Sequence, residues 1–303
     1  MIGNIFYWVF NMSISATVCA AAILIPRAFK RIPRRISVLL WWIPFLRMCI
    51  PFGIGGSVGL MPLISRLTKR PVAVYPSQHL PITSLNFAAV ADSYDPITYK
   101  SELIEKIFLI SGVIWLALTA LLISLFILLY ISTIRGISGA RHLYGKVYVS
   151  DRVRVPAVYG IIGAKIVIPE NTGKDRLEYI IRHEQAHIRR GDNILRIMAL
   201  CAICVHWFNP FCLLFFKLYC TDTELACDES VLSKCNEKQK KEYAHMLIGE
   251  AEKLSPIAPA FSGTSIRTRI ENIISFKRLS LIPAILSLGL IIAVFFVLLT
   301  IAK

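Results

Sequence analysis

Long apolar runs separated by short polar stretches dominate the chain. Residues 5–26, 38–64, 107–132 and 279–302 are almost wholly apolar. Each is long enough to cross the ~30 Å hydrocarbon core of a bilayer as a helix. The pattern therefore predicts four transmembrane helices, of which the first three form an N-terminal membrane region of residues 1–134.

The stretch between the third and fourth spans has a different pattern. Residues 146–149 and 157–168 are rich in β-branched and aromatic residues and punctuated by glycine, which predicts strands of a small sheet. Residues 169–173 indicate a turn, and Asp175 is a suitable N-cap for the helix that follows. We expect residues 135–278 to form an α+β domain inserted between the last two spans.

A further apolar run, residues 193–220, lies inside this domain. Charged residues and Pro210 interrupt it, so we expect a bent interfacial or re-entrant segment broken at Pro210, with one more span as the alternative. Residues 221–255 are polar and helix-prone. Residues 267–278 predict a basic, amphipathic helix or linker before the C-terminal transmembrane helix of residues 279–303.

Charge is distributed as in a multi-pass membrane protein. Only 17% of the residues are charged, against about 25% in average globular domains, and much of the net charge of +15 follows predicted spans. Residues 27–35 are strongly basic, which makes this loop cytoplasmic by the positive-inside rule, whereas residues 60–105 are balanced in charge and fit the outside. The prediction is a cell-membrane protein with both termini outside and the α+β domain in the cytoplasm.

The basic residues do not require nucleic acid as a partner. A juxtamembrane cluster beside anionic lipid explains residues 267–278 more simply, so the lipid bilayer is the expected partner and direct nucleic-acid binding is not. Eight cysteines are present, but none falls in the predicted external segment, which argues against a disulfide framework.

The candidate chemistry lies in His183-Glu184-Gln185-Ala186-His187. Residues four apart share one face of a helix, so His183 and His187 can present two imidazole nitrogens to one ion. That geometry suits tetrahedral zinc, which accepts nitrogen ligands at roughly 2.0–2.1 Å. Glu184 directly follows the first ligand, where it can take a proton from a metal-bound water.

A third ligand is expected downstream. Glu224 and Asp228 share one helical face, and such a pair alone is typical of a solvated helix surface. Combined with the upstream motif, Glu224 can complete a His-His-Glu site that leaves the fourth position for water. Asp228 can accept the second ring N–H of a ligating histidine. Tyr243 and His245 are interpreted as packing or surface residues.

With these motifs the sequence resembles the integral-membrane gluzincin peptidases of the BlaR/MecR type, the β-lactam-sensing antirepressor transducers of bacteria. The resemblance covers nearly the whole chain, including the predicted three spans before the protease domain and one after it. The matching residues are the strand 158–169 and residues 183–187, Arg190, Asp192, 207–210, 224–229 and 269–273.

By that resemblance, the chain binds one zinc ion through His183, His187 and Glu224. Glu184 would be the general base, and Asp228 would orient a ligand. Family transducers relay an external signal to a cytoplasmic protease domain, which leads to loss of a DNA-bound repressor. A cytoplasmic transcriptional repressor is therefore an implied protein substrate.

The resemblance also implies where substrates bind and are cut. The strand from residue 160 to residue 168 would be the sheet edge that receives an extended substrate segment. The expected contacts are Gly160, Ile161, Ile162 and Gly163. Some members cut themselves in the linker before the last span, which makes Ser275-Phe276 a candidate bond here.

One feature departs from the receptor pattern. β-Lactam receptors carry a penicillin-binding-like sensor after the last span, whereas this sequence ends at Lys303 and its external segment has no Ser-x-x-Lys motif. Antibiotic sensing is therefore not carried over. Sensing by residues 60–105, a separate sensor protein and truncation of the chain stay open, as does a homodimer.

The sequence thus predicts a membrane-embedded zinc metalloendopeptidase that hydrolyses peptide bonds on the cytoplasmic side, in signal transduction by repressor cleavage or self-cleavage. A broad-specificity quality-control protease is the alternative. A non-catalytic receptor or scaffold is a third reading, against which the complete set of ligands and base argues.

Overall fold

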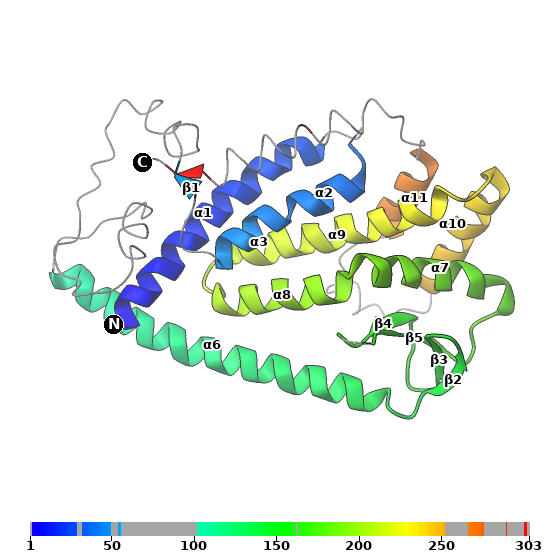
Figure 1. The fold of residues 1–303 in the computed structure, drawn as a ribbon, viewed down its shortest axis with the longest axis horizontal. Coiled ribbons are helices and arrows are strands. Elements are labelled where there is room, and N and C mark those ends of the chain that lie inside the picture. Colours follow the sequence, from blue (N-terminus) through cyan, green and yellow to red (C-terminus); the bar gives the residue numbers. More distant parts are fainter. Residues whose placement is uncertain are drawn as a thin grey trace.

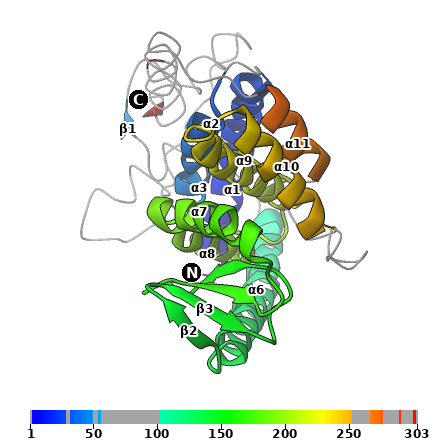
Figure 2. The same cartoon turned by 90° about the vertical axis from the view of Figure 1, so that its right-hand side faces the viewer.

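The computed structural model describes residues 2–28, 32–49, 54–55, 102–161, 163–251, 266–275, 289 and 300–301. Within these ranges the chain is mainly helical, and one small sheet lies at the end of the molecule opposite the N-terminus (Figure 1). Seen along the long axis, most of the helices are stacked above the sheet, whereas α6 reaches down to its level (Figure 2).

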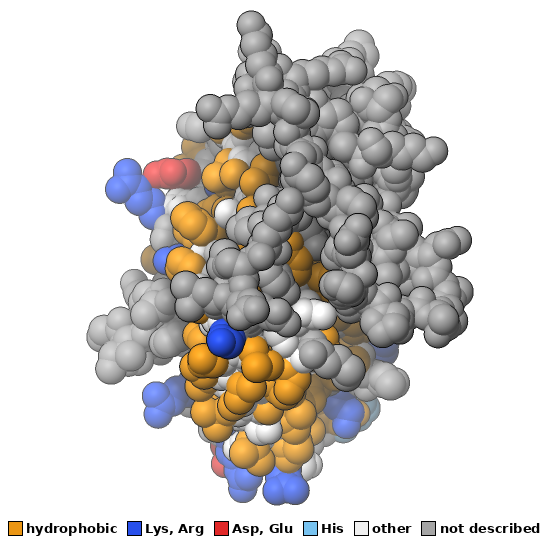
Figure 3. All heavy atoms as spheres, turned by 90° about the vertical axis from the view of Figure 1, so that its left-hand side faces the viewer, with side chains coloured by type: hydrophobic (Ala, Val, Ile, Leu, Met, Phe, Trp, Pro, Cys, Tyr) orange, Lys and Arg blue, Asp and Glu red, His pale blue; other side chains and the backbone are white. Residues whose placement is uncertain are grey.

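Two helices in the described part of the chain are long and apolar enough to cross a membrane. They are α1 (Ile2–Ala28) and α6 (Glu102–Gly136). The helices approach closely because Gly3 has no side chain; a Cβ atom there would lie 3.1 Å from the backbone nitrogen of Leu109. α6 leaves many Ile and Leu side chains exposed, and hydrophobic side chains gather on the face shown in Figure 3, as a lipid-facing surface requires.

The expected span of residues 38–64 begins as two short helices. α2 (Arg34–Leu40) and α3 (Trp42–Cys49) meet at Trp41, which is fully buried. Trp41 packs in an apolar cluster with side chains of α1 and of α9 (Pro210–Leu232). α1 and α2 therefore pack directly against a helix from the second half of the chain.

Two short segments differ from the expected spans. β1 (Ile54–Gly55) pairs in parallel with β6 (Thr300–Ile301), although both lie in runs predicted to be transmembrane helices. Proline and glycine neighbours around position 55 have low helix propensity, which accounts for the break there. Most of the remainder of both runs, and nearly all of residues 60–105, lies outside the described residues.

The sheet has the strand order β2-β3-β5-β4. Its strands are β2 (Arg141–Tyr144), β3 (Val147–Ser150), β4 (Ala157–Tyr159) and β5 (Lys165–Pro169). β3 and β5 run parallel, and β4 is antiparallel to β5. The prediction of strands at 146–149 and 157–168 is right in kind, but the second run forms two strands and β2 was not predicted.

Glycines divide that second run. Gly160 and Gly163 have φ values of 93° and 68°, a left-handed backbone that L side chains rarely adopt. The chain therefore reverses between β4 and β5, and Gly160, Ile161 and Gly163 lie in this connection, while Ile162 is outside the described residues. The predicted edge strand of residues 160–168 is wrong: β5 is an inner strand, and the free edge on this side is β4.

The two histidines of the motif lie on α7 (Lys174–Arg190). Its N-cap is Gly173 rather than the predicted Asp175, which lies inside the helix. Gly191, with φ 69°, ends α7 in a left-handed turn, and α8 (Asp192–Val205) starts at once. Because only a residue tolerant of positive φ permits this turn, Gly191 sets the angle between the two helices.

α8 and α9 form a helical hairpin, with the break at Pro210 as expected. The Asn209 side chain caps α9 by accepting the backbone N–H of Phe211 at 3.0 Å. α10 (Glu237–Ala251) and α11 (Ile266–Ser275) follow and pack beside α9 and α7.

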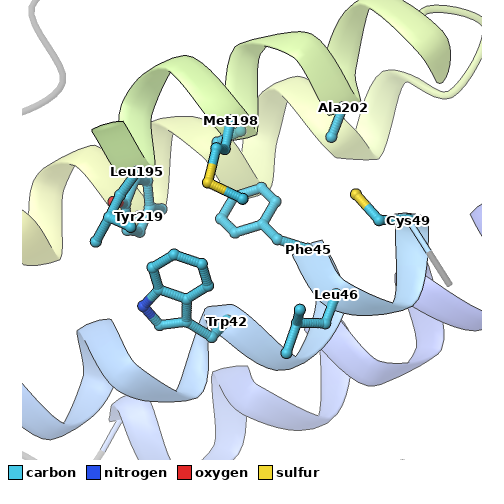
Figure 4. A pocket seen from close by; sticks show the side chains of 9 residues that line it. Trp42, Phe45, Leu46, Cys49, Leu195, Met198, Ala202 and Tyr219 are labelled. Atoms are coloured by element: carbon cyan, nitrogen blue, oxygen red, sulfur yellow. The ribbon is translucent and has the colours of Figure 1, made fainter. Parts of the chain in front are cut away.

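An apolar pocket of about 70 Å³ lies between α3, α8 and α9 (Figure 4). Side chains such as Trp42, Phe45 and Met198 line it. No carboxylate or imidazole lines the pocket, so the candidate chemistry lies elsewhere.

Candidate metal centre

His183 and His187 point their Nε2 atoms at the same place. The two atoms lie 3.2 Å apart, and both side chains are buried. The four-residue spacing on α7 produces this arrangement, because it stacks the rings one turn apart.

Glu224 reaches the same point from α9. Its Oε2 lies 3.3 Å from His183 Nε2, and its Oε1 lies 3.7 Å from His187 Nε2. Two ligands of a tetrahedral zinc ion at roughly 2.0–2.1 Å are separated by about 3.3 Å. The spacing and chemistry of the three donors therefore fit such an ion.

A hydrogen-bonded chain orients His183. Its Nδ1 lies 2.9 Å from Tyr243 Oη, and that hydroxyl donates to Asp228 Oδ1 at 2.6 Å. Burial, and then the charge of Asp228, raises the pKa of Tyr243 well above its ordinary value, so the hydroxyl keeps its proton. Because Tyr243 donates its hydroxyl proton to Asp228, it accepts a hydrogen bond from the Nδ1–H of His183. The Nε2 lone pair of His183 then remains for a metal ion on the side where Glu224 lies.

Asp228 is held as an anion. It is fully buried, and Arg269 of α11 donates to its two oxygens at 2.8 and 2.6 Å. Burial alone would raise the pKa of Asp228, but the Arg269 guanidinium outweighs it and lowers the pKa to about 2. Asp228 also lies 3.3 Å from His183 Nδ1, as the sequence predicts, although Tyr243 is the nearer partner.

A different carboxylate orients His187. Asp192 Oδ2 lies 2.8 Å from His187 Nδ1, and Arg190 Nε lies 3.4 Å from Asp192 Oδ1. The thiol of Cys227 is 3.4 Å from the same ring nitrogen. Because the Nδ1–H of His187 bonds to Asp192, its Nε2 can bind a metal. The same holds for His183, whose Nδ1–H bonds to Tyr243.

Two arginines lie beside Glu224. Arg196 Nη2 is 2.5 Å from Oε1, and Arg269 Nη1 is 3.8 Å from Oε2. Burial would raise the pKa of Glu224, but the His187 imidazole and Arg196 are among the groups that hold it well below its ordinary value. Glu224 is therefore an anion available for coordination.

The predicted base lies at the edge of this cluster. Glu184 follows His183 on α7 and is only 9% exposed. Burial, and then the nearby Glu184 charge, raises the pKa of Tyr159 on β4. β4 also packs against α7, so the free edge of the sheet lies beside the helix that carries Glu184.

The structure brings together all the predicted metal ligands, with Asp228 beside them. Tyr243, interpreted as packing or surface, is instead fully buried within the site. Asp192 and Arg269 belong to the motifs that carry the family resemblance, but the sequence alone assigns neither of them a role. Ser275 ends α11, and Phe276 lies outside the described residues.

This arrangement is typical of a metallohydrolase: two imidazoles and a carboxylate converge among buried groups that orient them, next to apolar helices. The model of the BlaR1 peptidase M56 family matches residues 7–275, and the chain belongs to this family. Membership places it among membrane metallopeptidases.

The chain is also similar to two bacterial proteins over part of its length. It is 28% identical over 103 residues to the methicillin resistance mecR1 protein of Staphylococcus aureus, covering 33% of this chain and 18% of that protein. It is 25% identical over 141 residues to the regulatory protein BlaR1 of Bacillus licheniformis, covering 43% of this chain and 24% of that protein. The chain thus spans a quarter or less of these relatives.

Proposed function

We propose that the protein is a zinc metalloendopeptidase of the HExxH gluzincin type, acting on the cytoplasmic side of the bacterial membrane. The convergence of His183, His187 and Glu224 carries this proposal, because both Nδ1 atoms are occupied by orienting partners and both Nε2 atoms face the Glu224 carboxylate and each other. Zinc held there would lower the pKa of a bound water toward about 7 and polarise the scissile carbonyl.

The residues of the chain supply proton transfer and substrate alignment. Glu184 takes the proton of the attacking water and returns it to the amine nitrogen released by bond cleavage. An extended peptide pairs with the free edge of β4, which lies beside α7, the helix that carries the base. The proposed substrate-binding edge is therefore Ala157–Tyr159, in place of the segment of residues 160–168 that the sequence predicts.

The substrate is proposed from the names of the relatives. One is a regulatory protein and the other a methicillin resistance protein, which favours a regulatory substrate such as a cytoplasmic repressor, or self-cleavage at Ser275-Phe276. Broad quality-control proteolysis is the second candidate, favoured because pairing along a strand edge uses the peptide backbone, which all sequences share.

Glu184→Gln tests the chemistry. This variant should retain zinc, because the three ligands remain, and should lose proteolysis of fluorescein-labelled casein by at least a hundredfold, because the base is gone. Metal analysis and the cleavage assay are made on the same detergent-purified sample. Cleavage at the wild-type rate would show that Glu184 is not the base.

His187→Ala tests the ligand set. The variant should lose both zinc and activity, and an undiminished zinc content would remove His187 from the site. A wild-type protein that binds zinc but cleaves nothing would support the non-catalytic scaffold. Proteomics of wild-type and Glu184→Gln cells separates the other candidates: one accumulating protein indicates a regulatory substrate, and many indicate quality control.

A further inference from the structure

Asn193 holds the free edge of the sheet. Its Nδ2 donates to the backbone carbonyls of Val158 and Gly160, at 3.3 and 3.2 Å. Ile166, the β5 partner of Val158, donates its backbone N–H to the Lys146 carbonyl just before β3, so the backbone groups of Val158 face away from β5. The Asn193 amide therefore lies on the open side of β4, where a substrate strand would pair.

The same turn of α8 also touches the metal ligands. Asp192, the preceding residue, bonds to His187 Nδ1, and Arg196, about one turn later, contacts Glu224. Residues 192–196 thus connect the edge of the sheet to two of the three candidate ligands. Any shift of this turn moves the edge and the ligands together.

β4 is a short edge strand that packs against α7 through side chains such as Val158. It is three residues long, pairs only with β5 and ends at a glycine with positive φ. A cavity of about 160 Å³ is lined by residues of β4, α6 and α8, with Asn193, Arg196 and Tyr130 among them. Because short edge strands open readily, we expect the two hydrogen bonds from Asn193 to fix the position of β4.

We propose that Asn193 is a positioning residue: its amide, bonded to the Val158 and Gly160 carbonyls, sets the free edge of β4 beside the metal cluster for an extended peptide. The proposal rests on the proposed peptidase function. The amide does not exclude substrate, because each carbonyl oxygen has a second lone pair that can accept a peptide N–H.

The test separates binding along the edge from chemistry. Two quenched fluorescent peptides share the Ser275-Phe276 bond, one with the sequence of residues 271–280 and one with that of residues 274–277. Asn193→Ala should raise KM for the longer peptide about tenfold, from two bonds of ordinary net strength, with kcat changed less than twofold. KM for the shorter peptide, which reaches less of the edge, should change less than threefold.

Two further variants make the result specific. Asn193→Gln keeps the amide and should restore at least half of the KM effect. The matched control Asn236→Ala removes an exposed amide that accepts the backbone N–H of Gln239 at the start of α10, outside the site, and should leave both KM values unchanged. Equal loss of kcat on both peptides would overturn the proposal, because it indicates general damage. A lower KM would also overturn it, because the amide would then compete with substrate.

Hydrogen exchange tests Asn193 without turnover. In the full-length zinc-loaded protein, Asn193→Ala should speed amide exchange at residues 157–159 about tenfold and leave α7 unchanged. Unchanged exchange at β4 overturns the proposal even if peptides are cleaved. If the wild type cleaves neither peptide nor casein, the proposed function fails, and the exchange result alone decides whether Asn193 holds the edge.

Discussion

Arg269 provides the sharpest test of how the site is held together. It is the guanidinium that neutralises Asp228, whose side chain has no exposure to solvent. Replacing Arg269 with Met keeps much of the side-chain volume but removes both hydrogen bonds and the charge. The Asp228 carboxylate then stays buried with Tyr243 and His183 as its remaining neighbours.

The expected cost is large. Removing one partner of a buried ion pair typically destabilises a protein by about 3–5 kcal/mol. For a chain of this size roughly 2 °C of melting temperature corresponds to 1 kcal/mol, so Arg269→Met should melt about 6–10 °C lower. Arg267→Met is the matched control on the same helix: its partner Glu271 and Arg267 itself are exposed, so the melting temperature should stay close to that of the wild type.

The measurement is a thermal melt of the zinc-loaded protein in detergent. Arg269→Met combined with Asp228→Asn should recover part of the loss, because no buried charge is then left unpaired. If Arg269→Met melted within 1 °C of Arg267→Met, the burial argument for Asp228 would be refuted. A double variant less stable than the sum of its parts would also contradict it.

Three other outcomes are expected. Asp192→Asn should weaken zinc binding about 10–100-fold, because His187 loses the carboxylate that orients its ring; competition with a chelator measures this, and a loss below twofold would contradict it. Asp222→Leu should cost about 3–5 kcal/mol in a detergent melt, because this buried carboxylate bonds to Arg27 and Trp41, and Asp222→Asn should cost less because its oxygen still accepts from Trp41. Chelation should abolish casein cleavage and added zinc should restore it, whereas activity that resists chelation would exclude a metal-dependent reaction.

Local spacing made part of the site predictable. His183 and His187 are one helical turn apart, so their convergence follows from helix geometry alone. Glu224 needed a second argument, because its approach depends on how α9 crosses α7, and only the downstream Glu-x-x-x-Asp spacing indicated it. The break at Pro210 was equally local, because proline has no backbone N–H to donate to a hydrogen bond inside a helix.

The groups that orient the ligands depend on tertiary packing. Tyr243 and Arg269 come from two later helices, and nothing in their local pattern distinguishes them from surface residues. Asp192 begins a new helix directly after Gly191, so its contact with His187 depends on the left-handed turn at that glycine. The edge strand was misplaced because β-branched residues on both sides of the glycines looked like one strand, and only the positive φ values show the reversal.

The candidate ligands divide between two helices with different surroundings. α9 contributes to two apolar clusters. Tyr219 packs with side chains of α1, α2 and α3, and Leu232 packs with the sheet, α7 and α10. Glu224 lies between these clusters, two residues after Asp222, which bonds to Arg27 at the end of α1. At 1.5 Å per residue, the backbone positions of Asp222 and Glu224 are about 3 Å apart along the axis of one continuous helix. The position of α1 is therefore tied to Glu224 through a single rigid element, whereas His183 is carried by α7, so the metal cluster has its observed spacing only when both helices are docked.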